Sequence, residues 1–442
     1  MKILFILQYI PYPLNSGGNQ ATFNMINCVR ENHEVSVLID MDNKDEQALS
    51  DLKKIWSDVK FYIFKHQSVL SFKHVSDMEN GMPQTFSIRL FDAIRRSMER
   101  KINRRIRRRQ ELVQKSPEEM EGDFIRENSC LFTSQDLLAK DFLEYVYTIA
   151  RKGFDVIQTE FYELLPLVYI LPENVTKVFV HHEIRFIRNK NEMDLFKKIV
   201  PSDICRYRGL KALELDSLSC YDKVIVLTDI DKQILLESCP GLDIYVSPAA
   251  VSVETVQEKA YKPAKDIVFV GNGYHFPNAD ALIWFCQCIV PVLKEKGIFS
   301  AIYVVGIWGD KIQRKILQVN PDVHFTGFVD DLSEFLNGKI SIVPIRIGSG
   351  MRMKILESVA AGSPIITTSK GCEGLPLTTQ KDCFIADTVE DFASAIEVMI
   401  THEDIQRQYA NQAKKTLSSG HMSREEALEN RLNFYKSLEK EI

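Results

Sequence analysis

Short apolar runs alternate with longer amphipathic segments along most of the chain. Runs of four to seven residues bounded by Gly, Pro or polar residues are typical of strands buried in a parallel sheet, and the amphipathic segments between them are typical of crossover helices. The strands predicted on this basis are 2–7, 33–39, 59–64, 154–159, 177–182 and 223–228 in the first half and 266–271, 301–306, 322–327, 339–345, 364–368 and 383–386 in the second. The pattern therefore predicts an α/β protein with two successive parallel sheets.

The length of 442 residues also favours two domains, because one hydrophobic core seldom serves so long a chain. Residues 247–265 contain two prolines and several charges without a clear period, which indicates a linker and a boundary near residue 250. We expect domains at 1–250 and 251–442. The alternation stops at about 66–152, which indicates a charged helical insertion in the first domain. A charged final helix at about 424–442 is a candidate to pack back on that domain.

The composition excludes several classes of protein. Lys and Arg number 55 against 60 Asp and Glu, and this net charge of −5 excludes the uniformly basic surface of a general nucleic-acid binder. The nine cysteines form no Cys-x-x-Cys pair, so neither a disulfide framework nor a Cys-rich zinc site is indicated. The apolar start lacks a cleavage site, and no uninterrupted apolar run reaches the roughly 18 residues of a membrane span. We expect a cytoplasmic protein that at most attaches to the inner face of the membrane.

A candidate anion site follows the predicted strand 339–345. The loop Gly348-Ser349-Gly350 precedes a helix predicted to run to residue 361, and a helix N-terminus offers unpaired N–H groups with partial positive charge. Arg352 and Lys354 stand in that first turn, where a cation opposes the helix dipole at a cost of about 0.3 to 1 kcal/mol. A bound phosphate or diphosphate would remove this conflict.

The geometry of a helix limits how these cations act together. Arg352 and Lys354 point about 200° apart on an ideal helix, so both reach one ligand only if Arg352 belongs to the loop. Glu357, one turn beyond Lys354, is a candidate acceptor for ribose hydroxyls. The alternative is a solvated first turn in which Lys354 and Glu357 form an i,i+3 ion pair.

Around these residues the second half of the chain resembles the retaining GT-B glycosyltransferases of family 4. The segments that carry the resemblance are FVGNGYHFPNADALIWF (269–285), VHFTGFVDDLSEFL (323–336), SIVPIRIGSGMRMKILESVAAGSPIITT (341–368) and GCEGL (371–375). The resemblance implies two facing Rossmann-like domains, with a nucleotide-sugar donor held mainly by the second domain and an acceptor held by the first.

The family motif carries over to particular positions. Glu357 matches the second acid of Glu-x7-Glu and would bind the ribose, and Arg352 and Lys354 match a variant suited to the diphosphate. Ser349 stands where many members carry the first Glu, and 271–273 stands where members carry an Arg and a Lys, for which Arg352 and Lys354 are expected to compensate. The expected donor-binding residues are Gly17, Gly18, Gly271, Asn272, Gly273, Ser349, Gly350, Met351, Arg352, Lys354 and Glu357.

In the first half the resemblance rests on two strand ends. Gly17 and Gly18, which follow Ser16, would let a helix N-terminus approach a phosphate or acceptor, or they form a plain turn. His181-His182-Glu183 follows the fifth predicted strand, and a family His at such a position lines the sugar site. His181, His182 and Glu183 are therefore the candidate catalytic residues, with a structural role as the alternative for either His.

The resemblance implies the reaction class. The expected function is retaining transfer of a hexosyl group from a UDP- or GDP-linked donor to a glycan acceptor in cell-surface polysaccharide or glycoconjugate synthesis, without another cofactor. A nucleotide-sugar epimerase or hydrolase, or a non-catalytic nucleotide-sugar-binding protein of the same fold, remains an alternative. No metal is expected, because Asp40-x-Asp42 ends a strand in a polar turn and Thr228-x-x-Asp231 fits a helix cap better than a cation site.

A basic stretch within the expected insertion points to the acceptor. Residues 89–109 hold ten Lys or Arg against two acids, and apolar residues recur there every three or four positions. Such an amphipathic helix can lie on an anionic membrane, which makes a lipid-linked acceptor a candidate. The equal alternative is that its apolar stripe packs on the first domain. No nucleic-acid partner is expected, because only Phe91 is available to stack on bases.

Charge reversal in this stretch tests the membrane hypothesis. Replacing Arg104, Arg105, Arg107, Arg108 and Arg109 with Glu should release the protein from anionic vesicles, since each basic residue near such a surface contributes on the order of 1 kcal/mol. Sedimentation with phosphatidylserine vesicles measures the bound fraction, and neutral vesicles are the control. Unchanged binding of the variant to anionic vesicles would contradict the hypothesis.

Overall fold

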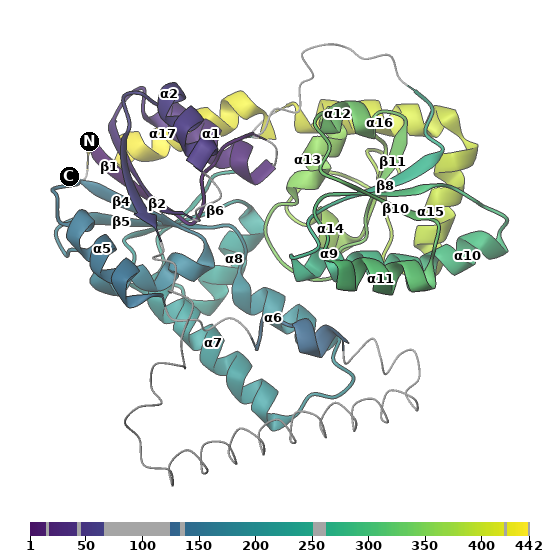
Figure 1. The fold of residues 1–442 in the computed structure, drawn as a ribbon, viewed down its shortest axis with the longest axis horizontal. Coiled ribbons are helices and arrows are strands. Elements are labelled where there is room, and N and C mark those ends of the chain that lie inside the picture. The colour runs from purple at the N-terminus through teal and green to yellow at the C-terminus, as the bar shows by residue number, and fades with distance from the viewer. Residues whose placement is uncertain are drawn as a thin grey trace, which may run out of the picture.

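The computed structural model has two α/β domains that lie side by side (Figure 1). It describes residues 1–14, 17–41, 46–65, 124–132, 138–250, 262–419 and 422–440. Predictions that fall outside these residues concern Ser16, Asp42, the basic stretch 89–109 with Arg104, Arg105, Arg107, Arg108 and Arg109, and most of the linker.

The first domain is built on a seven-stranded, fully parallel sheet of order β3-β2-β1-β4-β5-β6-β7. Its strands are β1 (Lys2–Leu7), β2 (Glu34–Met41), β3 (Lys60–Lys65), β4 (Val156–Glu160), β5 (Thr176–His181), β6 (Lys223–Val226) and β7 (Ile244–Val246). Its helices are α1 (Gly17–Val29), α2 (Glu46–Ile55), α5 (Lys140–Ala150), η3 (Tyr162–Ile170), α6 (Arg185–Asp194), α7 (Pro201–Ser219) and α8 (Asp229–Ser238).

The second domain repeats this plan with a six-stranded parallel sheet of order β10-β9-β8-β11-β12-β13. Its strands are β8 (Asp266–Val270), β9 (Ile302–Val305), β10 (Val323–Gly327), β11 (Lys339–Val343), β12 (Ile365–Thr367) and β13 (Phe384–Ile385). Its helices are α9 (Phe276–Trp284), η4 (Phe285–Ile289), α10 (Val290–Glu295), α11 (Asp310–Val319), α12 (Leu332–Leu336), α13 (Met353–Ala360), α14 (Ser369–Cys372), α15 (Val389–Thr401) and α16 (Glu403–Leu417).

Both sheets have a point at which the strand order reverses. The chain moves outward from β1 to β3 and returns on the other side of β1 at β4, and it does the same around β8 and β11. Loops that leave the carboxyl ends of such central strands diverge, and the crevice between them is where open α/β sheets bind ligands. This strand order therefore places one such ligand-binding crevice in each domain.

The predicted strands are all present, with ends that shift by one or two residues, so the α/β class with two parallel sheets is confirmed. The sequence pattern missed β7, which has only three residues. It also assigned α5 to an insertion. Instead, α5 covers the first sheet, where Phe142 packs edge-on against Phe64 with ring centroids 5.2 Å apart. It is the crossover helix between β3 and β4, so any insertion ends before residue 140.

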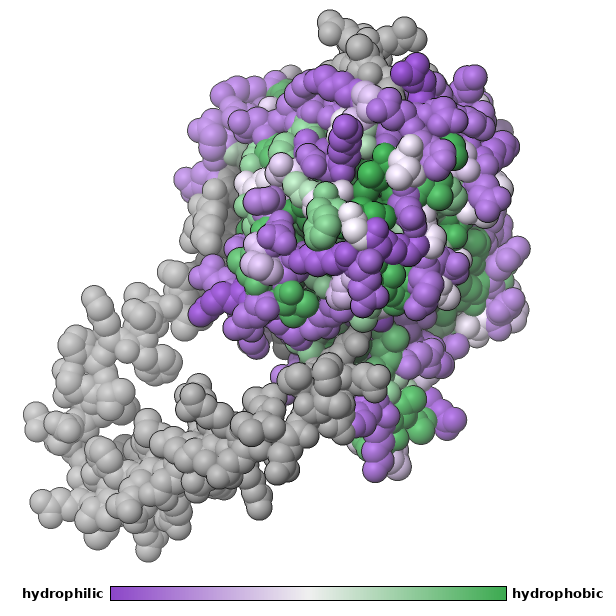
Figure 2. Space-filling view, turned by 90° about the vertical axis from the view of Figure 1, so that its right-hand side faces the viewer, coloured by the Kyte–Doolittle hydropathy of each residue, from purple (hydrophilic) through white to green (hydrophobic). Residues whose placement is uncertain are grey.

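Among the residues that the structure describes, one helical run, Phe276–Glu295, is long and apolar enough to cross a membrane. It consists of α9, the π-turn η4 and α10, and most of it is buried in the core of the second domain. The outer face of that domain is covered largely by hydrophilic side chains (Figure 2). The run is therefore explained by its place in the core of an α/β domain, although it passes the length test for a span.

The final helix, α17 (Arg424–Leu438), crosses back and packs on the first domain beside α1 (Figure 1). Phe434, Tyr435 and Leu438 are buried in the same core cluster as β1 and β2. The hydroxyl of Tyr245 donates a hydrogen bond of 3.0 Å to the carbonyl oxygen of Asn430. The first domain therefore draws on both ends of the chain for its core.

A backbone contact brings the carboxyl ends of the two sheets together. Gly350 has φ +76°, and a Cβ atom there would lie 2.2 Å from the carbonyl oxygen of His182. Next to it, the N–H of Ile184 donates to the Ser349 hydroxyl at 2.6 Å. Only a glycine satisfies both the left-handed backbone and this distance.

An apolar cluster reinforces this contact. Residues from the first domain meet residues that flank the loops of the second domain, and all of them are buried. The members of this cluster are Ile125, Leu131, Met193, Phe196, Leu210, Phe276 and Ile347. Burial of this apolar surface favours the docked arrangement of the two domains.

Alanine substitution at two glycines tests the docking contact. Gly153 has φ +85°, but a Cβ atom there would meet no other atom within 4 Å, so Gly153→Ala carries backbone strain alone. Gly350→Ala adds a clash with His182, which should cost a further ~1–3 kcal/mol and lower the Tm by several degrees more. Equal melting temperatures for the two variants would show that the contact at residue 350 is not tight.

Candidate active site

A cleft of about 1000 Å³ lies between the domains, at the carboxyl ends of both sheets. Loops and helix starts from the two domains supply its walls. The sequence-predicted residues that line it are Gly17, Gly18, His182, Glu183, Gly271, Asn272, Ser349, Met351, Arg352, Lys354 and Glu357. Eleven positions from four segments that are far apart in the sequence thus share one cavity.

Three other predicted residues do not line the cleft. His181 is buried, and its Nε2 lies 2.9 Å from the carboxylate of Glu214, which also accepts from the backbone N–H groups that begin α6. Gly273 packs against the indole of Trp308, and Gly350 serves the domain contact. Of the two adjacent histidines, only His182 therefore lines the cleft. His181 contacts Glu214, the acid that accepts from the N–H groups at the start of α6.

Arg352 is the N-cap of α13 and lies in the loop, not in the first helical turn where the sequence analysis placed it. This is the condition under which Arg352 and Lys354 can reach one ligand. Its Nη1 donates to the carbonyl oxygens of Ser349 and Gly350, while its Nε and Nη2 have no hydrogen-bond partner among the described residues. Burial lowers the pKa of Arg352, against the opposing influence of Glu183.

Lys354 points toward the start of helix α9, which lies in the connection between β8 and β9. Its Nζ donates to Asn278 Oδ1 at 2.7 Å and lies 4.5 Å from the ring centroid of Phe269. A Cβ atom at Gly271 would be only 3.0 Å from this Nζ, so the lysine occupies the space beside that glycine. Burial, reinforced by Arg352, lowers the pKa of Lys354 to about 7.

Glu357 reaches across the domain boundary. Its carboxylate accepts a hydrogen bond from the backbone N–H of Gly17, at the start of α1. A Cβ atom at Gly17 would come within 2.6 Å of Met353 Cβ, so this approach also requires a glycine. Burial raises the pKa of Glu357 to about 7, against the influence of Gly17 and Lys354. The solvated ion pair between Lys354 and Glu357 is not what the structure contains, because each is bound to another group.

Two further cations, Arg185 and Arg188, stand in the first turn of α6 and line the cleft, although the sequence pattern did not identify them. Arg185 pairs with Glu163 at 2.7 Å, and Arg188 pairs with Glu183 at 3.1 Å and Glu192 at 2.9 Å. The same signal that indicated Arg352, cations at a helix start that follows a strand, could have identified both.

The acid between these cations is Glu183. Burial opposes its charged form, but Arg188 and His275 outweigh burial and lower the pKa of Glu183 to about 2. The pKa of His275 is itself lowered to about 4, chiefly by burial, so its ring is neutral at pH 7 and lies 3.3 Å from Arg188 Nη1. Glu183 is therefore an ionised partner of Arg188 in the wall between the domains.

Of the paired aspartates considered as a cation site, Asp231 belongs to a helix cap. The Thr228 hydroxyl accepts from the N–H of Asp231 at 3.0 Å and donates to its carboxylate at 2.7 Å, which caps α8. Within the described ranges, no group of three or more His, Cys, Asp or Glu side chains is arranged to hold a metal ion.

Comparison with known proteins bears on both domains. Residues 264–402 match the family model described as Glycosyl transferases group 1. A search of curated protein sequences gave no significant match.

Solved structures that resemble the whole chain have the same two-domain fold. S. aureus TarM aligns with 12% identity over 98% of this chain and 100% of its own, with a TM-score of 0.64. Sucrose-phosphate synthase from Thermosynechococcus elongatus aligns with 12% identity over all of both chains, also at 0.64. An E. coli trehalose-6-phosphate protein bound with UDP-2-fluoro glucose aligns with 11% identity over 99% and 98%, at 0.59.

At these identities the structural likeness shows the fold, while the family match rests on the segment that contains Arg352, Lys354 and Glu357. The resemblance found in the sequence motifs is confirmed at this level. The second domain carries the Glycosyl transferases group 1 match, and the chain as a whole has the two-domain architecture of the GT-B glycosyltransferases.

Proposed function

We propose that the protein is a retaining glycosyltransferase that transfers a hexosyl group from a nucleoside-diphosphate sugar to a glycan acceptor. One observation carries the proposal. Arg352 and Lys354 line the cleft without forming an ion pair with any carboxylate of the described residues, and Arg352 keeps two buried nitrogens unpartnered. Partly buried cations that form no ion pair favour an anionic ligand.

The donor would span the two walls of the cleft. Its diphosphate would bind at the start of α13, where Arg352 offers free N–H groups and Lys354 a point charge. Glu357 would exchange the N–H of Gly17 for ribose hydroxyls, and this exchange would free the N-terminus of α1 for the ligand. The sugar would then lie toward His182.

The same groups would assist the reaction. Departure of the nucleoside diphosphate develops negative charge on a phosphate oxygen, and fixed cations in a partly desolvated cleft stabilise that charge. In a front-face reaction with retention, that oxygen takes the proton of the acceptor hydroxyl. No separate base or bound metal is then needed, so the arrangement fits a metal-independent enzyme.

Structures of the same fold support a UDP-linked donor. TarM was solved with UDP and alpha-GlcNAc-glycerol, and the E. coli protein was bound with UDP-2-fluoro glucose. We infer that UDP-hexoses are the first donors to test, followed by GDP-linked sugars. The basic stretch 89–109 further suggests a lipid-linked acceptor at the inner membrane face, in the synthesis of a cell-surface polysaccharide or glycoconjugate.

A second candidate rests on Ser349. Its hydroxyl accepts from the N–H of Ile184, and no acid stands at this position to hold the donor sugar. The absence of an acid at position 349 fits a nucleotide-sugar epimerase or hydrolase, or a non-catalytic binding protein, better than a sugar transferase. Incubation of UDP-hexoses with and without glycan acceptors, followed by product identification, distinguishes transfer from epimerisation, hydrolysis and simple binding.

Two substitutions test the donor site. Arg352→Ala should weaken UDP binding at least about tenfold, because hydrogen bonds to charged groups contribute about 1.5–3 kcal/mol, and Glu357→Ala should weaken it by a similar factor through the ribose. Titration calorimetry measures both. Arg314→Ala, on the exposed face of α11, is the matched control and should bind UDP like the wild type. Wild-type affinity in both site variants would remove the assignment.

Lys354 should take up a proton when a diphosphate binds. Its pKa of about 7 in the free protein leaves it mostly neutral at pH 8, and a neighbouring phosphate favours its charged form. The affinity for UDP should therefore fall as pH rises from 7 to 9. Below pH 6 it should fall again, because Glu357, with a pKa of about 7, is then protonated and a worse acceptor for ribose.

Calorimetry at pH 8 in buffers of different ionisation enthalpy measures this uptake. The wild type should take up a substantial fraction of a proton per UDP, whereas Lys354→Gln should take up none. Arg352→Ala should take up a smaller fraction than the wild type, because Arg352 helps to lower the pKa of Lys354 in the free protein. An equal uptake in Lys354→Gln would assign the proton to another group.

A further inference from the structure

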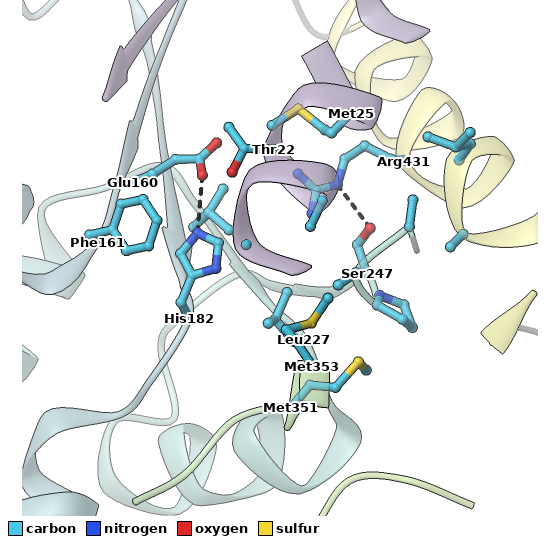
Figure 3. Close-up of a pocket in the computed structure, with 18 of the residues that line it drawn as sticks. Thr22, Met25, Glu160, Phe161, His182, Leu227, Ser247, Met351, Met353 and Arg431 are labelled. Carbon is cyan, nitrogen blue, oxygen red and sulfur yellow. Dashed lines mark hydrogen bonds and ion pairs between the residues drawn. The ribbon is translucent and has the colours of Figure 1, made fainter. Parts of the chain in front are cut away.

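A chain of buried hydrogen bonds runs from the last helix to the cleft. The Tyr435 hydroxyl of α17 donates to Gln158 Oε1 at 2.5 Å, Gln158 Nε2 donates to Glu160 Oε1 at 2.9 Å, and Glu160 Oε2 lies 3.0 Å from His182 Nε2. Tyr435, Gln158 and Glu160 have no exposed surface. Figure 3 shows the final link, with the ring of His182 turned toward Glu160.

The direction of these bonds sets the tautomer of His182. Because the amide oxygen of Gln158 accepts from Tyr435, its NH₂ group is turned to Glu160, which therefore accepts with one carboxylate oxygen. The other oxygen then accepts from His182 Nε2–H. In a neutral imidazole with Nε2 protonated, Nδ1 carries a lone pair, and no described residue hydrogen-bonds this atom.

Phe161 fixes the plane of the same ring. Its side chain stacks on His182, with centroids 4.3 Å apart and planes 12° apart, and Tyr9 packs on Phe161 at 5.2 Å. Phe161 adopts φ +71°, a left-handed conformation that costs a bulky residue about 1–3 kcal/mol and persists only where the surroundings impose it. The ring of His182 is thus held by a bond in its plane and by a stack on its face.

Glu160 itself does not reach the large cleft. It borders a second cavity of about 140 Å³ behind His182, which is lined by α1, β4, α17, the start of α13 and the residues after β7, with Met25 and Leu227 among its apolar side chains (Figure 3). His182 and Phe161 line both the cavity and the cleft. Among the residues that line both, His182 is the one whose ring hydrogen-bonds Glu160, so His182 links Glu160 to a sugar bound in the cleft.

We propose that Glu160 is a positioning residue that locks His182 in the Nε2–H tautomer, so that Nδ1 accepts a hydrogen bond from a hydroxyl of the substrate in the cleft. Gln158 and Tyr435 complete the positioning, which makes the last helix a part of the site. This inference rests on the proposed function for its substrate, a sugar, but the state of the His182 ring can be measured without any reaction.

Nitrogen NMR of the full chain, with the nine histidines labelled with ¹⁵N and His182 assigned through His182→Gln, tests the tautomer directly. The wild type should have the proton on Nε2. In Glu160→Gln, the new amide can donate as well as accept, so His182 should become a mixture of tautomers. A wild-type ring protonated on Nδ1 alone, or an unchanged pattern in Glu160→Gln, would overturn the proposal.

Kinetics separate positioning from folding. Glu160→Gln should lower kcat at least about tenfold while the KM for the donor stays within about twofold, because the nucleotide is bound by other residues. Its Tm reports whether the fold is retained. An unchanged kcat in a folded Glu160→Gln variant would contradict the proposal.

Substitutions at two tyrosines test the contribution of α17. Tyr435→Phe removes the donor that orients Gln158 and should lower kcat by about two- to fivefold with a measurable change in the His182 spectrum. Tyr245→Phe is the matched control, since it also removes a tyrosine hydrogen bond to α17 but lies outside the chain of bonds. Equal kcat and equal spectra in the two variants would remove α17 from the positioning chain.

These outcomes are distinguishable from a failure of the proposed function. If the wild type transfers no sugar but His182 has the Nε2–H tautomer and loses it in Glu160→Gln, the positioning holds and the reaction assignment fails. If transfer occurs and the tautomer does not depend on Glu160, the positioning fails and the reaction assignment holds.

Discussion

The approach of the loop 348–350 to the end of strand β5 is the constraint on which the cleft depends. Gly350 lies against the carbonyl oxygen of His182 with no room for a side chain, and Ser349 accepts from the N–H of Ile184. Backbone contacts of this kind hold two surfaces at a short, defined distance. Because the loop belongs to the second domain and the strand end to the first, this one contact places the carboxyl ends of both sheets on the same cavity.

The two walls of that cavity differ in how their charges are compensated. On the first domain, Arg185 and Arg188 are paired with acids, and the partly buried Glu183 stays ionised because Arg188 lies beside it. On the second domain, Arg352 and Lys354 donate their hydrogen bonds to carbonyl and amide oxygens and form no ion pair with a carboxylate of the described residues. Keeping such cations desolvated is unfavourable, and the structure meets this cost partly by lowering the pKa of Lys354. A ligand with two phosphates would favour the charged form of Lys354. Binding of such a ligand would therefore be linked to protonation of this lysine.

Elements remote in sequence support the first domain's wall. Helix α17, which follows the entire second domain, buries Tyr435 against β1 and β4 and contacts Gln158 there. Through Gln158 and Glu160 it reaches His182, while Phe161, on which Tyr9 packs, stacks on the face of the His182 ring. The orientation of His182 thus depends on three segments. These are the residues just after β1, with Tyr9, strand β4, with Gln158 and Glu160, and helix α17, with Tyr435.

The sequence by itself determined the α/β class and the succession of two parallel sheets, and it singled out the segment around Arg352, Lys354 and Glu357 as the candidate donor site. These features are local: strand period, glycines and cations at a helix start can be recognised in a few consecutive residues. The same signal, cations at a helix start that follows a strand, is present at Arg185 and Arg188. By contrast, nothing local distinguishes His181 from His182, because adjacent residues on a strand point to opposite faces and only the packed neighbours decide which face meets the cleft.

Only the tertiary structure decided that Arg352 leaves the helix, that Glu357 meets Gly17 across the domain boundary and that Tyr435 reaches Gln158. It also decided that α5 belongs to the sheet and not to an insertion. The contacts of Glu357 with Gly17 and of Tyr435 with Gln158 join residues that are far apart in the sequence, and no periodic pattern along the chain predicts them. They depend on how two finished sheets dock, and docking is set by surface shape and by the distance that residues such as Gly350 permit, quantities that exist only after the chain has folded.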